Sequence, residues 1–144
     1  MLDTNVYGLL RMTRRIIPAM KRRNAGHIVN IGSIAGFYTY GNGAMYAGTK
    51  HAVKAITGAL RYELNGTAIR VSEMDPGMVE TEFSVVRLKD EAKAKSVYQG
   101  MTPLKGRDIA ECVYFITSRP AHVNVDHLLI MPTDQASVYK THRR

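Results

Sequence analysis

A chain of 144 residues is long enough for one domain with a hydrophobic core and too short for us to expect two. Its 45% hydrophobic and 22% charged residues argue against a disordered or fibrous class, and no apolar run approaches the roughly 20 residues that a membrane span needs. The net charge of +8 would suit an acidic partner, but the arginines gather on one predicted helix without a nucleic-acid-binding motif, so we expect no nucleic acid and no membrane as partners.

The first predicted element is an amphipathic helix over residues 2–23, in which arginines lie between apolar residues at helical spacing. Those apolar residues are Leu2, Val6, Leu9, Leu10, Ile16, Ile17 and Met20. Pro18 is expected to bend the helix or to shorten its last turn, and Asn24-Ala25-Gly26 should stop it. A short buried strand over residues 27–31 follows.

The middle of the chain is expected to form a loop, a helix and a second strand. Glycine, tyrosine and asparagine mark residues 34–44 as a loop, and the next helix runs from about 44 to 64. Residues 68–74 have the length of a strand. Asp75-Pro76-Gly77 should end that strand as a turn, with Asp75 acting only as a turn former.

The remaining residues predict two more helices and a third strand. Residues 84–99, rich in Lys and Glu, indicate a mobile or partly exposed helix, whereas 107–118 form a better helix and 127–131 a strand. The polar tail from Thr133 is expected to be frayed. Because strands alternate with helices, we predict an α/β fold whose strands pair in parallel through right-handed crossovers.

A tyrosine and a lysine on the predicted helix form a candidate proton-transfer pair. Tyr46 and Lys50 are four residues apart and therefore share one face of the helix. A cation near a phenol favours the phenolate, which brings its proton within reach of chemistry near neutral pH. A Tyr-x-x-x-Lys pair alone is a short motif that chance also supplies, so its surroundings decide its meaning.

Other polar residues follow the carboxyl ends of the strands, where ligands bind in doubly wound sheets. Ser33 follows the first strand, Pro76-Gly77 follows the second, and Tyr46 opens the intervening helix, so we expect all three to converge. Each position has an ordinary structural alternative: a helix N-cap for Asn5 and Thr81, and turns for Ser33 and Pro76-Gly77. Tyr38 and Tyr40 either line a substrate pocket or simply pack in the loop. His122 and His127 have no partner at ligand spacing, so we expect no metal site.

Four ordered motifs together resemble the C-terminal part of the short-chain dehydrogenase/reductase family. They are Thr4-Asn5-Val6-Tyr7-Gly8, Asn30-Ile31-Gly32-Ser33-Ile34-Ala35-Gly36, Tyr46-x-x-x-Lys50 and Pro76-Gly77-x-Val79-x-Thr81. The ending, with Pro120-Ala121-His122-Val123-Asn124-Val125, is similar to the branch that contains NADP-dependent 3-hydroxy acid and serine dehydrogenases. The resemblance implies the C-terminal part of a doubly wound parallel-sheet Rossmann-type domain, so residues 1–144 would be a single partial domain.

The resemblance also implies an oxidoreductase that interconverts a secondary alcohol and its carbonyl. Tyr46 would be the acid/base, and Lys50 would lower the pKa of Tyr46 and hold the nicotinamide ribose. Ser33 would bind the substrate oxygen, together with Tyr46. Asn5 would place a water in a proton relay to Lys50.

The same resemblance assigns cofactor contacts to the segment after the second strand. Pro76, Gly77, Val79 and Thr81 would contact the nicotinamide, and Glu82, Phe83 and Ser84 would extend that contact. The expected cofactor is NADP, with NAD as the second candidate. We also expect a small alcohol or carbonyl substrate, assembly as a homodimer or homotetramer, and a cytoplasmic location, since the sequence begins without a signal-peptide pattern.

One part of the family pattern has no counterpart here. The family's Gly-rich phosphate-binding turn, Thr-Gly-x-x-x-Gly-x-Gly, is absent, so the adenosine half of a dinucleotide lacks its site. We therefore expect a fragment of an active enzyme that binds NADP(H) poorly by itself. The alternative is a non-catalytic truncated protein that acts through helix-mediated association.

Overall fold

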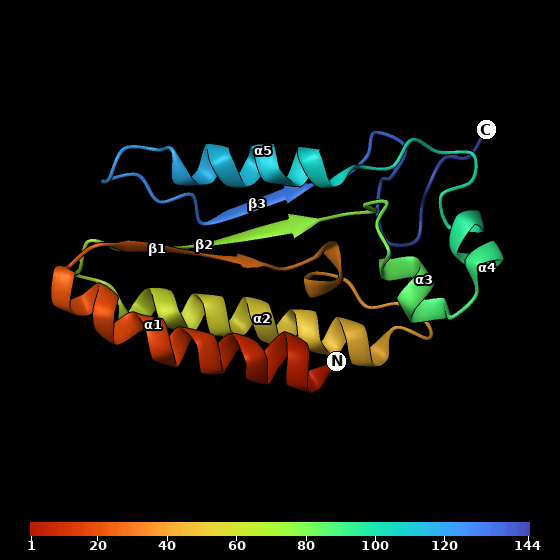
Figure 1. The fold of residues 1–144 in the computed structure, drawn as a ribbon. Helices are drawn as coiled ribbons and strands as arrows, with labels where there is room; N and C mark the ends of the chain where they lie inside the picture. Colours follow the sequence, from red (N-terminus) through yellow and green to blue (C-terminus); the bar gives the residue numbers. More distant parts are fainter.

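The computed structural model describes residues 1–144 as a three-stranded parallel sheet between two layers of helices (Figure 1). Strands β1 (Gly26–Ile31), β2 (Ile69–Pro76) and β3 (His127–Ile130) lie in the order β1-β2-β3. Both pairings are parallel, and Glu73 of β2 lies opposite His127 of β3. The predicted α/β class and its three strands are confirmed. None of the helices is long and apolar enough to cross a membrane.

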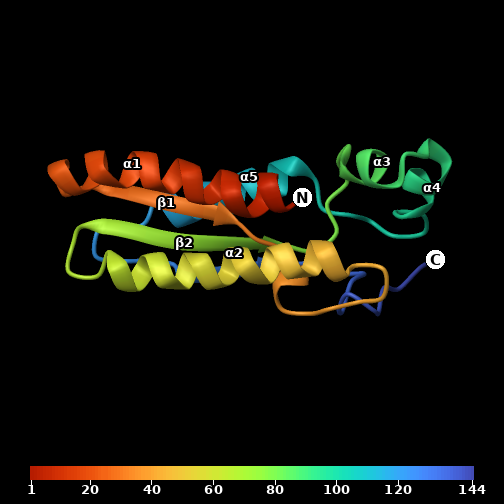
Figure 2. The same cartoon turned by 90° about the horizontal axis from the view of Figure 1, so that it is seen from below.

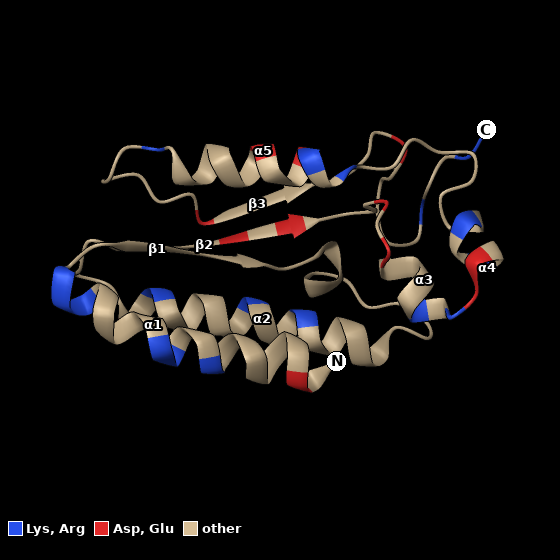
Figure 3. Cartoon of the chain, in the orientation of Figure 1, with Lys and Arg blue, Asp and Glu red and all other residues tan.

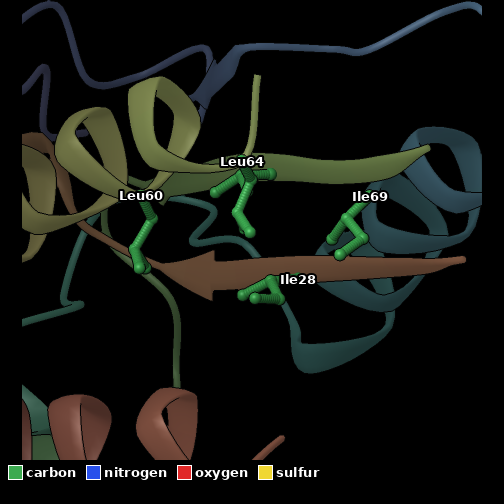
Figure 4. Close-up of a cluster of buried hydrophobic side chains, with 5 residues drawn as sticks. Ile28, Leu60, Leu64 and Ile69 are labelled. Carbon is green, nitrogen blue, oxygen red and sulfur yellow. The ribbon is translucent and has the colours of Figure 1, made fainter. Parts of the chain in front are cut away.

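The two faces of the sheet are covered by different helices. Helices α1 (Leu9–Arg23) and α2 (Ala44–Glu63) lie on one face, and α5 (Gly106–Thr117) lies on the other (Figure 1). The core between sheet and helices contains Ile28, Leu60, Leu64, Ile69 and Val71, four of which are labelled in Figure 4. Each such buried side chain stabilises the fold by about 1.5–3 kcal/mol, which holds α2 against the strands.

The first helix differs from its prediction in its opening residues and at Pro18. It opens with a wide π-helical segment, η1 (Asp3–Gly8), and then continues as α1 through Pro18 to Arg23. The expected shortening at Pro18 is therefore wrong. Pro18 is exposed, so water can solvate the carbonyl that it leaves unpaired, while the apolar face of α1 stays packed on the core. Asn24, at φ 47°, ends the helix in the left-handed region, as expected.

Strand β2 extends beyond its expected end at Met74. Asp75 pairs with Leu129 and Pro76 with Ile130, so both residues belong to the sheet rather than to a turn. Pro76 is tolerated because it is the last residue of the strand, where its missing N–H breaks no continuing ladder. The prediction of Asp75 as a turn former is wrong.

The segment beyond the carboxyl ends of the strands carries two short helices. These are α3 (Phe83–Leu88) and α4 (Glu91–Ser96), separated by Lys89 at φ 52° and by Asp90, which caps α4. A mobile or partly exposed helix was expected over residues 84–99, and its division into two follows from this break. Figure 2 shows α3, α4 and the C-terminal end of the chain together at this end of the sheet.

The tail from Thr133 is folded, so the expectation of a frayed end is wrong. Gln135 is buried and forms a bridge with Thr141, and the N–H of Arg144 donates to the carbonyl of Gly100. The side chain of Gln135 accepts a hydrogen bond from the N–H of Met78 at 2.8 Å. These hydrogen bonds to distant residues hold the tail in a fixed conformation, although its polar composition predicts no regular structure.

Candidate active site

Ser33 is held at the carboxyl end of β1 by two hydrogen bonds. Its Oγ accepts from the N–H of Ala35 at 3.1 Å and caps the short helix η2 (Ile34–Gly36). Its own N–H donates to Oδ1 of Asp75 at 3.0 Å. Ser33 is buried, with 7% of its surface exposed, so both bonds lie largely away from water. The hydroxyl group is thereby fixed at the rim of the sheet.

Tyr46 and Lys50 lie in the first two turns of α2, next to Ser33. The Nζ of Lys50 lies 5.9 Å from the centroid of the Tyr46 ring and donates to the carbonyl of Ile31 at 2.9 Å. The ring of Tyr46 packs at 5.3 Å, centroid to centroid, on that of Phe83. The structure thus brings the helix, the end of β1 and α3 together around one phenol.

The charge states of this pair are governed by burial. Burial raises the pKa of Tyr46, and the neighbouring Ser33 hydroxyl opposes that shift. Burial also lowers the pKa of Lys50, against the carboxylates of Glu73 and Asp75, which raise it. The expected lowering of the Tyr46 pKa by Lys50 is therefore not observed in this chain. The Lys50 ammonium donates to the Ile31 carbonyl instead of to the phenol. The free-energy cost of burying a phenolate therefore exceeds the stabilisation that the surrounding cations give it.

These residues line a cleft of about 350 Å³ at the carboxyl ends of the strands. The lining includes seven of the eight predicted site residues: Ser33, Tyr46, Lys50, Pro76, Gly77, Val79 and Thr81. Phe83 and Ser84 also contribute, and most of the remaining wall is apolar. A side chain at Gly77 would collide with Gln135 and Met131, so the backbone approaches the tail closely here. A few polar side chains in a mainly apolar lining are typical of a binding site for an organic ligand.

Asn5 is the one predicted site residue that does not line the cleft. Its Nδ2 donates to Oγ1 of Thr49 at 3.0 Å, which ties the first helix to α2 beside Lys50. Asn5 lies within the π-helical segment η1, and such distortions often occur at functional sites. Its role in placing a water for Lys50 stays a prediction.

Sequence reasoning missed a cluster of titratable groups beneath Ser33. Glu73, Asp75 and His127 offer ligand atoms that lie within 4.8 Å of one another, and both carboxylates are fully buried. Oδ2 of Asp75 is 3.3 Å from Nδ1 of His127. Burial and the Asp75 carboxylate raise the pKa of Glu73 to about 7. Alternate residues of a strand share one face, so Glu73 and Asp75 lie on the same face of β2 as the apolar residues 69 and 71. This alternation in the sequence could have indicated that the two carboxylates are buried together.

Two further residues of the cleft carry functional groups. Tyr40 lines the cleft, which agrees with one of the two alternatives for the loop tyrosines, whereas Tyr38 does not. Arg87 of α3 also lines it, and its guanidinium lies 5.8 Å from the centroid of the Tyr40 ring. Figure 3 shows Lys and Arg positions in blue along α1, α2 and α5 as well as on α3 and α4.

Comparison with known families assigns the class of protein. The family model described as short chain dehydrogenase matches residues 1–92, which include Asn5, Ser33, the Tyr46–Lys50 pair and the Pro76–Thr81 segment. The match covers more than half of the chain. The chain belongs to the short-chain dehydrogenase family.

Particular relatives are similar over nearly the whole chain. An uncharacterised oxidoreductase of Mycobacterium tuberculosis is 49% identical over 138 residues, covering 95% of this chain and 55% of the relative. The NADP-dependent 3-hydroxy acid dehydrogenase of Escherichia coli is 46% identical over 138 residues, covering 94% of this chain and 56% of the relative. The chain therefore spans about half the length of these curated relatives.

Solved structures show the same fold. The closed form of serine dehydrogenase complexed with NADP+ matches with a TM-score of 0.94 at 45% identity, over 100% of this chain and 59% of that one. Serine dehydrogenase from Escherichia coli matches with a TM-score of 0.78 at 39% identity, over 94% of this chain and 53% of that one. The three-stranded parallel sheet and its helices thus correspond to part of a larger Rossmann-type domain.

Proposed function

We propose that this chain is the catalytic, C-terminal half of an NADP-dependent oxidoreductase that interconverts a secondary alcohol and its carbonyl compound. The observation that carries the proposal is the convergence of Ser33, Tyr46 and Lys50 on one cleft at the carboxyl ends of β1 and β2. Membership of the family and the names of the relatives support it. NAD is the second candidate cofactor, and a cytoplasmic location remains a prediction.

The nicotinamide end of the cofactor fits the cleft. Pro76, Gly77, Val79 and Thr81 line it together with the polar side chains of Ser33, Tyr46 and Lys50. The adenosine end has no Gly-rich turn among these 144 residues, so another segment must hold it. When bound, the nicotinamide donates or accepts the hydride.

The residues of this chain handle the proton and the substrate oxygen. In the reducing direction, the Tyr46 hydroxyl donates its proton to the carbonyl oxygen, and the Ser33 hydroxyl donates a hydrogen bond to the same atom. A protonated Tyr46, favoured by its raised pKa, is the form that this direction requires. The Lys50 ammonium holds the nicotinamide ribose, and Asn5 supports the water that returns the proton.

A 3-hydroxy acid is the substrate class that we propose within this reaction. The support is the name of the Escherichia coli relative and the high structural similarity to a serine dehydrogenase, whose substrate is also a hydroxy acid by its name. At about 350 Å³, the cleft has room for a molecule of this size.

The test is Tyr46→Phe in a fusion that joins the N-terminal part of the Escherichia coli relative to residues 1–144. The fusion supplies the phosphate-binding half and keeps this chain intact. Tyr46→Phe should lower kcat by at least about a hundredfold, because only the transferable proton is removed. Tyr114→Phe, at a residue 74% exposed, is the matched control and should leave kcat unchanged. Near-wild-type turnover of a folded Tyr46→Phe variant would refute the assignment.

A second candidate function is association without catalysis. Four large apolar side chains are more than half exposed on the outer sides of η1, α1 and α2: Tyr7, Met12, Met45 and Tyr62. We propose that these faces support a homodimer or homotetramer. Sedimentation of the chain and of Met12→Glu tests this: the variant should shift toward monomer, and a chain that is monomeric throughout would contradict it.

A further inference from the structure

The charges that line the active-site cleft all have one sign. Among its lining residues, the only Lys and Arg side chains are Lys50 and Arg87, and no aspartate or glutamate contributes. The Lys50 ammonium already donates to the Ile31 carbonyl. Arg87 takes part in none of the ion pairs of the chain. The cleft therefore contains one guanidinium with free donors and no internal counter-ion.

The position of Arg87 is defined by the helix that carries it. Arg87 follows Phe83 by four residues, so the two share one face of α3 about 6 Å apart along its axis. Because the Phe83 ring packs on Tyr46, Arg87 lies one helical turn beyond the reacting phenol. Its positive charge is close enough to lower the pKa of Tyr46 slightly against the effect of burial.

Two contacts hold this part of the cleft in place. The Arg87 guanidinium lies over the Tyr40 ring, at 5.8 Å from its centroid, which limits the directions of its donors. On the same helix, Ser84 hydrogen-bonds the Tyr98 hydroxyl at 2.8 Å, and that hydroxyl donates to the carbonyl of Val79. Helix α3 is thereby held against the segment Pro76–Thr81, which we propose contacts the cofactor.

We propose that Arg87, supported by the ring of Tyr40, binds the carboxylate of the substrate and makes the site selective for hydroxy acids over neutral secondary alcohols. The inference rests on the proposed function and adds the residue that sets the substrate class. A guanidinium binds a carboxylate through two parallel N–H donors, so it fixes the orientation of the substrate as well as its charge. The alcohol carbon is then directed at Tyr46 and Ser33.

The test compares an acid with its uncharged ester in the fusion described above. The substrates are 3-hydroxybutyrate and its methyl ester, and the variants are Arg87→Met and Arg87→Lys. Arg87→Met should raise the KM for the acid roughly tenfold to hundredfold, as expected for losing hydrogen bonds to a charged group, and leave the ester unchanged. Arg87→Lys should restore part of the affinity. Arg22→Met, at an exposed arginine of α1, is the matched control and should change neither.

Other outcomes overturn the inference. Equal losses for acid and ester, with a raised KM for NADP+, would assign Arg87 to the cofactor instead. An unchanged KM for both the acid and the ester would show that Arg87 is a solvent-exposed cation that does not bind the substrate. Because a fusion that oxidises no alcohol refutes the proposed function rather than this inference, binding is also measured on the 144-residue chain by NMR. Added 3-hydroxybutyrate should shift the Arg87 side-chain signal and the ester should not; an unshifted signal refutes the subsite.

Discussion

The backbone N–H of Ser33 donates to the side chain of Asp75 at 3.0 Å. Ser33 lies two residues beyond the end of β1, and Asp75 is the next-to-last residue of β2, 42 residues further along the chain. Asp75 is fully buried. This bond connects the candidate active-site serine to the sheet, so the position of its hydroxyl depends on a carboxylate that does not line the cleft.

Replacing Asp75 should therefore destabilise the fold at Ser33. Asp75→Ala leaves the buried N–H of Ser33 without an acceptor, which costs roughly 1–3 kcal/mol. Asp75→Asn keeps an oxygen acceptor and should cost less. Urea denaturation measures both free energies of unfolding, with Asp3→Ala at an exposed aspartate as the control. Equal stability of Asp75→Ala and the wild type would show that the bond is not needed.

The stability of the chain should fall as the pH rises toward neutrality, because of Glu73. Its pKa is about 7 in the folded chain and roughly 4.3 when unfolded, so the folded state holds a proton that the unfolded state has lost between these values. This contribution is fully present below the lower value and lost through the upper one. Glu73→Gln, which imitates the protonated side chain, should be more stable than the wild type at pH 8 and similar to it at pH 4.

The control for this prediction is Glu91→Gln, at an exposed glutamate of α4. Urea denaturation should give Glu91→Gln the same change in free energy of unfolding between pH 4 and pH 8 as the wild type. If Glu73→Gln lost stability at pH 8, the buried carboxylate would have to be ionised and paired in the folded chain, contrary to its raised pKa.

The 144-residue chain alone should bind NADPH weakly. In the proposed function the cleft holds only the nicotinamide end, and the chain contains no Gly-rich turn to hold the phosphates. Fluorescence titration of NADPH should show no saturation in the micromolar range, whereas the fusion should saturate there. Micromolar affinity of the chain by itself would mean that a Gly-rich turn is not needed to bind NADPH.

The buried amide of Gln135 should hold the C-terminal segment to the cleft wall. Its Oε1 accepts from Met78 N–H at 2.8 Å and its Nε2 donates to the Ser137 carbonyl at 3.2 Å. Gln135→Ala should lower stability by roughly 1–3 kcal/mol and speed proteolysis of the tail. Gln99→Ala, at an exposed glutamine, is the control. Unchanged proteolysis would show that the tail is held by its backbone bonds alone.

Much of the local structure could be predicted from short-range patterns. The apolar spacing over residues 2–23 predicted one helix, and the loop signals before residue 44 placed the start of a second that runs to about 64; the structure confirms both, because these signals depend only on neighbouring residues. The positions of Ser33 and Tyr46 relative to the strand and helix ends followed from the same signals. Their convergence with Pro76 on one cleft then followed from parallel pairing.

What only the tertiary structure decided are the features that depend on residues distant in the sequence. Asp75 was predicted to form a turn, and its contacts with Ser33 and His127 required the register of three strands. The folded tail, the guanidinium of Arg87 over Tyr40 and the raised pKa of Glu73 likewise arise from long-range packing. By itself the sequence determined the elements and the chemical groups, since periodicity and motif spacing are local. Burial, and with it pKa values and ligand-facing geometry, depended on which distant segments the fold placed against each group.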